Sequence, residues 1–92
     1  MSSFADDLDD AFRNLSLALS LCRSAQGFLT SGQDQTLELV VLVGQSGEGD
    51  TRELVQAAQL VSEAKVYAEK AVEFILEAMA AIQAYKDQLN LS

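Results

Sequence analysis

Apolar residues recur every seven positions through the second half of the chain. One series reads Leu54, Val61, Ala68, Ile75, Ile82 and Leu89, and a second reads Ala57, Ala64, Ala71, Ala78 and Tyr85. No Gly or Pro interrupts residues 51–89. A strict seven-residue repeat lies along one side of an α-helix. The pattern therefore predicts a long helix from about residue 51 to about residue 89 that packs against another helix.

The first half of the chain carries apolar residues in alternating steps of four and three. The series is Phe4, Leu8, Ala11, Leu15, Ala18, Cys22, Ala25 and Leu29. We expect a helix from about residue 3 to about residue 43 that starts after Ser2 or Ser3, since either can cap the first N–H groups. Asp6 and Asp7 would place negative charge at the positive end of its dipole.

Residues 30–43 are the ambiguous part of this first helix. Ser31-Gly32 is typical of a helix end, and the β-branched residues of 36–43 are compatible with a buried strand. However, the four-and-three pattern continues through Gly32, Thr36, Leu39 and Val43. A lone strand would also leave its backbone N–H and C=O groups without partners. The interpretation favoured here is a helix with a break near residues 31–33.

A glycine-rich segment separates the two predicted helices. Residues 44–50 contain three of the five glycines, and the whole chain contains no proline. Gly44 suits the left-handed position that ends a helix, and Asp50 with Glu53 resembles a capping box at the next one. The sequence thus predicts an all-α fold in which residues 1–92 form a single antiparallel helical-hairpin domain with a turn at 44–50.

The apolar band of the second helix is wider than one partner helix can cover. Four of every seven positions are largely apolar, whereas a two-stranded seam uses two. We therefore expect the hairpin to dimerise into a four-helix bundle. The expected helix-packing residues are Leu54, Ala57, Val61, Ala64, Ala68, Ala71, Ile75, Ala78, Ile82 and Tyr85, with Phe4, Leu8, Leu15, Cys22 and Leu29.

Charge and composition argue against several classes of function. The net charge of −8 disfavours binding to nucleic acid or to an anionic membrane. The chain has no His, and its single Cys22 is expected to be a buried structural residue. We expect no catalytic, cofactor-binding or metal-binding residues, and hence no enzyme.

The first residues of the chain are acidic, and no apolar signal segment follows them. Unbroken apolar runs such as residues 39–43 are far shorter than the ~20 residues that a membrane span requires. A cytoplasmic location is therefore expected, with export conceivable only by a route that uses no cleaved signal.

Glu69, Glu73 and Glu77 are spaced four apart on the second predicted helix. The favoured interpretation is a solvated face in which Lys65 pairs with Glu69. The alternative is an acidic face that binds a basic partner.

The predicted architecture resembles the W-x-G family of type VII secretion substrates and related small actinobacterial coiled-coil proteins. The resemblance rests on a hairpin of about ninety residues, the Gly44-Gln45-Ser46 turn, and an Ala-rich helix with Tyr85 near its end. Two family motifs are incomplete. Leu42-Val43-Gly44 stands where the family has Trp-x-Gly, and Tyr85 is followed four residues later by Leu89 instead of an acid.

Together these observations predict a non-enzymatic helix-packing protein. It would pair with itself, most simply as a homodimer, or with another helical protein, and the resemblance implies a partner related to a secreted effector or toxin. The alternative is a small acidic immunity protein or antitoxin that covers a basic toxin surface. The first would bind through its apolar residues and the second through Glu69, Glu73 and Glu77, so the two differ in salt dependence.

Overall fold

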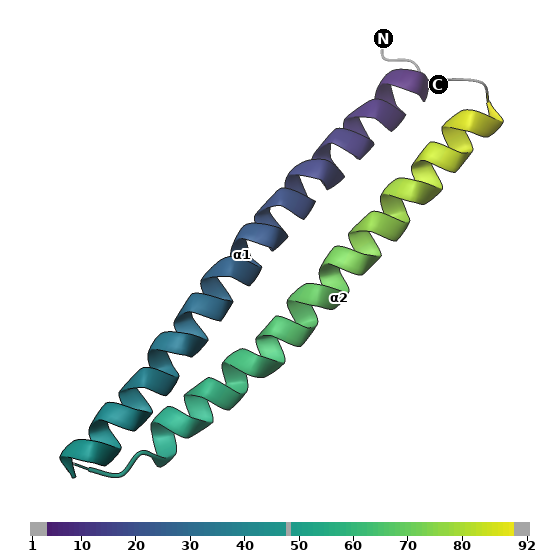
Figure 1. Ribbon diagram of the computed structural model, residues 1–92. Coiled ribbons are helices and arrows are strands. Elements are labelled where there is room, and N and C mark those ends of the chain that lie inside the picture. Colours follow the sequence, from purple (N-terminus) through teal and green to yellow (C-terminus); the bar gives the residue numbers. More distant parts are fainter. Residues whose placement is uncertain (1–3, 48, 90–92) are drawn as a thin grey trace.

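The computed structural model describes residues 4–47 and 49–89, and it consists of two long helices joined by a short turn (Figure 1). Helix α1 spans Phe4–Ser46 and helix α2 spans Arg52–Gln88. They run antiparallel, so the start of α1 and the end of α2 lie at the same end of a rod that measures 66 × 19 × 15 Å. The described residues contain no strand. The predicted all-α helical hairpin is therefore confirmed.

The ambiguous segment 34–43 is helical, as the four-and-three pattern predicts. The break predicted near residues 31–33 is not present, because α1 continues through them without interruption. One glycine inside a helix costs only about 1 kcal/mol. Within this stretch the Thr36 hydroxyl donates to the Gly32 carbonyl at 2.7 Å, and Gln33 bonds to α2.

The end of α1 lies three residues later than the sequence predicts. Gly47, not Gly44, adopts the left-handed conformation, with φ of 69°. Its N–H donates to the Val43 carbonyl at 3.1 Å, which satisfies a carbonyl that the last helical turn leaves open. Gly44 is an ordinary residue of the last turn of α1.

The start of α2 is held by Asp50, although not as a capping box. One oxygen of its carboxylate accepts the backbone N–H of Arg52 at 2.9 Å, and the other pairs with the Arg52 guanidinium at 2.6 Å. Thr51 occupies the cap position without a side-chain hydrogen bond to the backbone. The capping serines expected for α1, Ser2 and Ser3, lie outside the described residues.

The contact between the helices is a single thin seam. Among the described residues only Leu19 and Ala58 are buried, at 9% and 4% exposure. The other seam residues are half-buried and are again spaced by four and three. We call this set the inner seam: Leu8, Phe12, Leu15, Leu19, Cys22, Gln26, Leu29, Gln33, Thr36, Val40 and Val43 on α1, and Leu54, Ala58, Val61, Lys65, Ala68, Val72, Ile75, Met79, Ile82 and Lys86 on α2.

The positions of the two glycines predict opposite effects of the same substitution. Gly44→Ala should stabilise the protein by up to about 1 kcal/mol, because alanine is the better helix former. Gly47→Ala should destabilise it by about 1 kcal/mol, because a side chain is strained in the left-handed conformation. Urea unfolding followed by circular dichroism measures both. Effects of the same sign would place the end of α1 elsewhere.

The thin seam also predicts which leucine holds the hairpin together. Leu19→Ala should lower the free energy of unfolding by about 2–3 kcal/mol, near the small end of the range for a buried leucine. Leu17 is 59% exposed two residues earlier, so Leu17→Ala should change it by less than about 0.5 kcal/mol. Equal losses for the two variants in urea titrations would contradict the observed seam.

Candidate interaction surface

The structure brings most of the predicted packing residues together in the inner seam. Those found there are Leu54, Val61, Ala68, Ile75, Ile82, Leu8, Leu15, Cys22 and Leu29. Ala57, Ala64 and Ala71 are half-buried at its edge. Phe4, Ala78 and Tyr85 are exposed, and their part in an interface between chains remains a prediction.

The sequence pattern does not identify the second column of the seam on either helix. On α2 the pattern favours the alanine series from Ala57 to Ala78, whereas the structure uses the series of Ala58, Lys65, Val72, Met79 and Lys86. On α1 it favours the series from Phe4 to Ala25, whereas the structure uses Phe12, Leu19, Gln26, Gln33 and Val40. The columns actually used contain Gln and Lys, so a search for unbroken apolar series passes over them.

These polar seam residues make the hydrogen bonds that cross between the helices. The Gln33 side-chain amide nitrogen donates to the Ser62 hydroxyl. The Lys65 ammonium donates to the side-chain amide oxygen of Gln33 at 3.0 Å. Near the open end, Lys86 pairs with Asp9 at 2.5 Å. The Lys86 side chain is only 15% exposed, while Asp9 is 50% exposed. Their partners Ser62 and Asp9 both lie on one side of the inner seam, and we call this side of the hairpin the polar face.

The antiparallel arrangement places the unused alanine columns together on the opposite side. In both helices the alanine column precedes the leucine column of the seam by four residues: Ala11 comes before Leu15, and Ala57 before Val61. The columns follow one another in a fixed rotational order around each helix. Because α2 runs opposite to α1, this order is clockwise on one helix and anticlockwise on the other when both are viewed along one axis. Columns with the same offset therefore fall on the same side of the pair.

We call this opposite side the apolar face, and it extends along both helices. Next to each alanine column lies a column of larger residues. The members are Phe4, Ala11, Ala18, Leu21, Ala25, Phe28, Leu39 and Leu42 on α1, and Ala57, Leu60, Ala64, Tyr67, Ala71, Phe74, Ala78, Ala81 and Tyr85 on α2. Its largest side chains are mostly in solvent, with Phe28 at 78% exposure and Phe74 at 66%.

The apolar face is also free of charge over most of its length. Its four columns include Asn14, Gly32 and Gln35, but no charged residue between positions 8 and 42 of α1 or between positions 57 and 85 of α2. Solvent-exposed faces of stable helices normally carry charged residues. An uncharged, aromatic-containing face of this extent indicates a surface made for contact with another apolar surface.

Glu69 and Glu73 lie away from the apolar face, Glu77 borders it beside Phe74, and all three are exposed. Lys65 does not pair with Glu69 as predicted. Lys65 lies in the inner seam, and its ammonium bonds to Gln33 on α1 instead of to a glutamate of its own helix. The three glutamates therefore form an exposed acidic ridge without the expected lysine.

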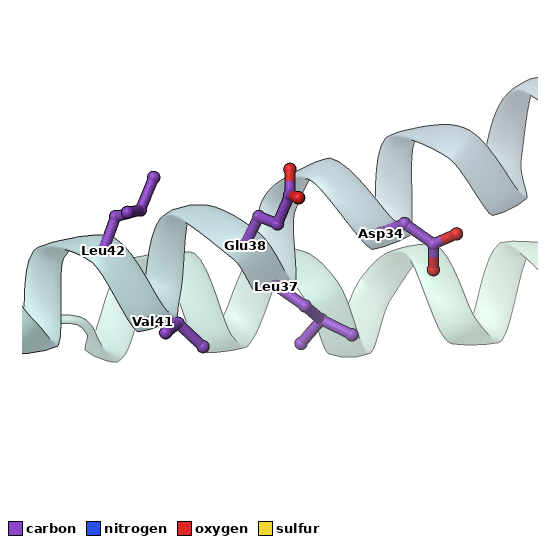
Figure 2. Close-up of a pocket in the computed structure, with 5 residues that line it drawn as sticks. All are labelled: Asp34, Leu37, Glu38, Val41 and Leu42. Carbon is purple, nitrogen blue, oxygen red and sulfur yellow. The ribbon is translucent and has the colours of Figure 1, made fainter.

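A hollow near the turn is lined by Asp34, Leu37, Glu38, Val41 and Leu42, all from α1 (Figure 2). Figure 2 shows that Leu37 and Val41 point to one side of the helix, while Glu38 and Leu42 point to the other. Ligand sites enclose their ligand and direct a few polar groups toward it. This open hollow on a single helix does neither, so it does not compete with the apolar face as the candidate site.

The described residues offer little for other chemistry. They contain no group of three or more His, Cys, Asp or Glu side chains that could hold a metal ion. Cys22, which the sequence predicts to be buried, is half-buried in the inner seam. Neither described helix is long and apolar enough to cross a membrane.

The chain matches no known protein family, no curated protein sequence and no solved structure.

The bridge between Asp9 and Lys86 predicts a stability difference between two neighbouring aspartates. Asp9→Asn should lower the free energy of unfolding by about 1 kcal/mol, because it leaves the largely covered Lys86 ammonium without its counter-charge. The matched control is Asp10→Asn, which makes the same change in net charge. Asp10 pairs with Arg13 at 3.1 Å, but both side chains are mostly exposed, so the loss should be below about 0.5 kcal/mol.

Urea titrations at low and high salt measure this difference, which should shrink in high salt as the bridge is screened. Indistinguishable variants would mean that Lys86 and Asp9 do not hold the open end of the hairpin together.

Proposed function

We propose that this chain is a non-enzymatic interaction protein that works by packing its apolar face against helices of another polypeptide. The partner is either a second copy or a different helical protein. The exposed apolar face carries this proposal, because each large apolar side chain left in water forgoes roughly 1.5–3 kcal/mol of burial. A chain with several such residues on one face gains most by covering them.

The breadth of the apolar surface supports a bundle as the form of this contact. Helices that contribute to a bundle are apolar at the two seam positions of each seven-residue repeat and at one flanking position. In this hairpin the flanking position is the alanine column on both helices. Packing a second pair of helices on that side would complete a four-helix bundle.

The resemblance to W-x-G hairpins suggests a biological setting for the contact. The hairpin fold agrees with that resemblance, and on this basis the partner is proposed to accompany a secreted effector or toxin. The apolar face supports helix packing whether or not the chain is exported.

The competing function is an acidic immunity protein or antitoxin that covers a basic toxin surface. One observation favours it: Glu69, Glu73 and Glu77 are exposed, and Lys65 is engaged with Gln33 instead of Glu69. A contact of that kind depends on charge and weakens steeply with salt. The apolar face has no part in it.

Recovery of complexes from the cells of origin distinguishes the two functions. A tagged chain should be recovered in complexes heavier than the 9.9 kDa monomer, measured by native mass spectrometry, and these should persist in high salt. Tyr67→Glu should abolish them, because it introduces a charge into the apolar face. The triple substitution of Glu69, Glu73 and Glu77 to Gln should leave them intact.

The reverse result, loss with the triple substitution and persistence with Tyr67→Glu, would support the immunity function and contradict ours. Circular dichroism of each variant controls for loss of the helical fold.

A further inference from the structure

We infer that the apolar face binds a second copy of this chain, face to face, so that the two alanine-lined centres meet. This inference rests on the proposed function and names its partner. Three observations carry it: the excess of exposed surface, the absence of charge, and the arrangement of small and large side chains across the face.

The exposed surface of the chain is too large for a typical monomer. The chain exposes 6743 Å². A folded monomer of 9.9 kDa exposes about 5,200 Å² on average, so the excess is about 1,500 Å². A stable interface removes about 800 Å² from each partner. The excess is therefore larger than the area that each partner covers in a stable dimer.

The absence of charge makes the face compatible with its own copy. Each chain carries a net charge of −8, so two copies repel unless their carboxylates are kept apart. The four columns of this face contain no carboxylate over residues 8–42 of α1 and residues 57–85 of α2. Packing two copies by this face therefore brings no carboxylates together there. A basic partner would find no acid there, and an anionic membrane would be repelled by the acidic ridge and the net charge.

The shape of the face is complementary to itself. The two alanine columns lie side by side along its middle, and larger residues such as Leu21, Phe28, Tyr67 and Phe74 flank them. Small residues in the middle allow two backbones to approach closely, while the flanking side chains pack over the edges of the facing copy. A two-fold axis presents the same patch from both chains, so each copy supplies what the other requires.

Two exposed apolar residues of α2 provide a matched test. Phe74 lies on the apolar face, and Val66 lies outside it at 50% exposure. Neither is in the inner seam, so a charge at either position leaves the contact within the hairpin unchanged. Sedimentation equilibrium should show a wild-type dimer at micromolar concentration. Phe74→Glu should raise the dissociation constant roughly 100-fold or more, and Val66→Glu less than about threefold.

Salt distinguishes this dimer from one held by charge. Because like net charges are screened, raising the salt concentration should leave the dissociation constant unchanged or lower it. A rise in the dissociation constant with salt would contradict an uncharged interface.

A second pair of variants keeps the test valid if the glutamates unfold the chain. The protein contains no Trp, so Phe74→Trp and Val66→Trp each introduce a single indole, which is excited at wavelengths where the two tyrosines do not absorb. Neither substitution removes apolar volume. Emission from Phe74→Trp should shift to longer wavelength on dilution through the dissociation range. Emission from Val66→Trp should stay at the wavelength of a solvated indole throughout.

Each contrary outcome overturns a stated part of the inference. A wild-type chain that stays monomeric at millimolar concentration excludes the second copy, while complexes of other composition in the cell would still support the proposed function. A dimer more sensitive to Val66→Glu than to Phe74→Glu places the interface on another face. A dilution shift for Val66→Trp alone leads to the same conclusion.

Discussion

Two helices in contact cover only a narrow strip of each other's surface, and the consequences of this limit extend through the whole molecule. Each helix of the hairpin presents two columns to its neighbour, and only Leu19 and Ala58 are buried there. Yet the chain carries apolar residues in roughly twice as many columns. Much of what one hairpin cannot cover lies on the apolar face, and the proposed function depends on that part of the surface.

The polar residues of the seam determine which side remains exposed. Gln33, Lys65 and Lys86 are partly covered by the helix pair. Gln33 bonds to Ser62 and accepts a hydrogen bond from Lys65, while Lys86 pairs with Asp9. Covering a polar group without a partner is costly, so the helices settle in the rotation that lets these side chains bond at the edge. The fully apolar alanine columns then turn to the other side.

The sequence is a good guide to the fold and an incomplete guide to the surface. The glycine-rich turn at 44–50 predicts the antiparallel arrangement, and the spacing of apolar residues predicts both helices and the helical state of residues 34–43. It does not distinguish Gly44 from Gly47 as the helix end, because either glycine tolerates the left-handed conformation. Nor does it identify the seam columns that contain Ala58 and Leu19. These columns include Gln and Lys, and choosing the most apolar series instead favours residues that a single hairpin leaves exposed. Pairing polar residues across the helices, as with Asp9 and Lys86, is the signal that separates the two.

Small-angle X-ray scattering combined with light scattering tests the central claim most directly. Face-to-face packing predicts a particle of twice the 9.9 kDa chain mass whose length stays close to the 66 Å of one hairpin, with a thicker cross-section. A particle of single-chain mass would contradict the claim. So would a dimer of nearly doubled length, because the copies would then meet at their ends and leave the apolar face in water.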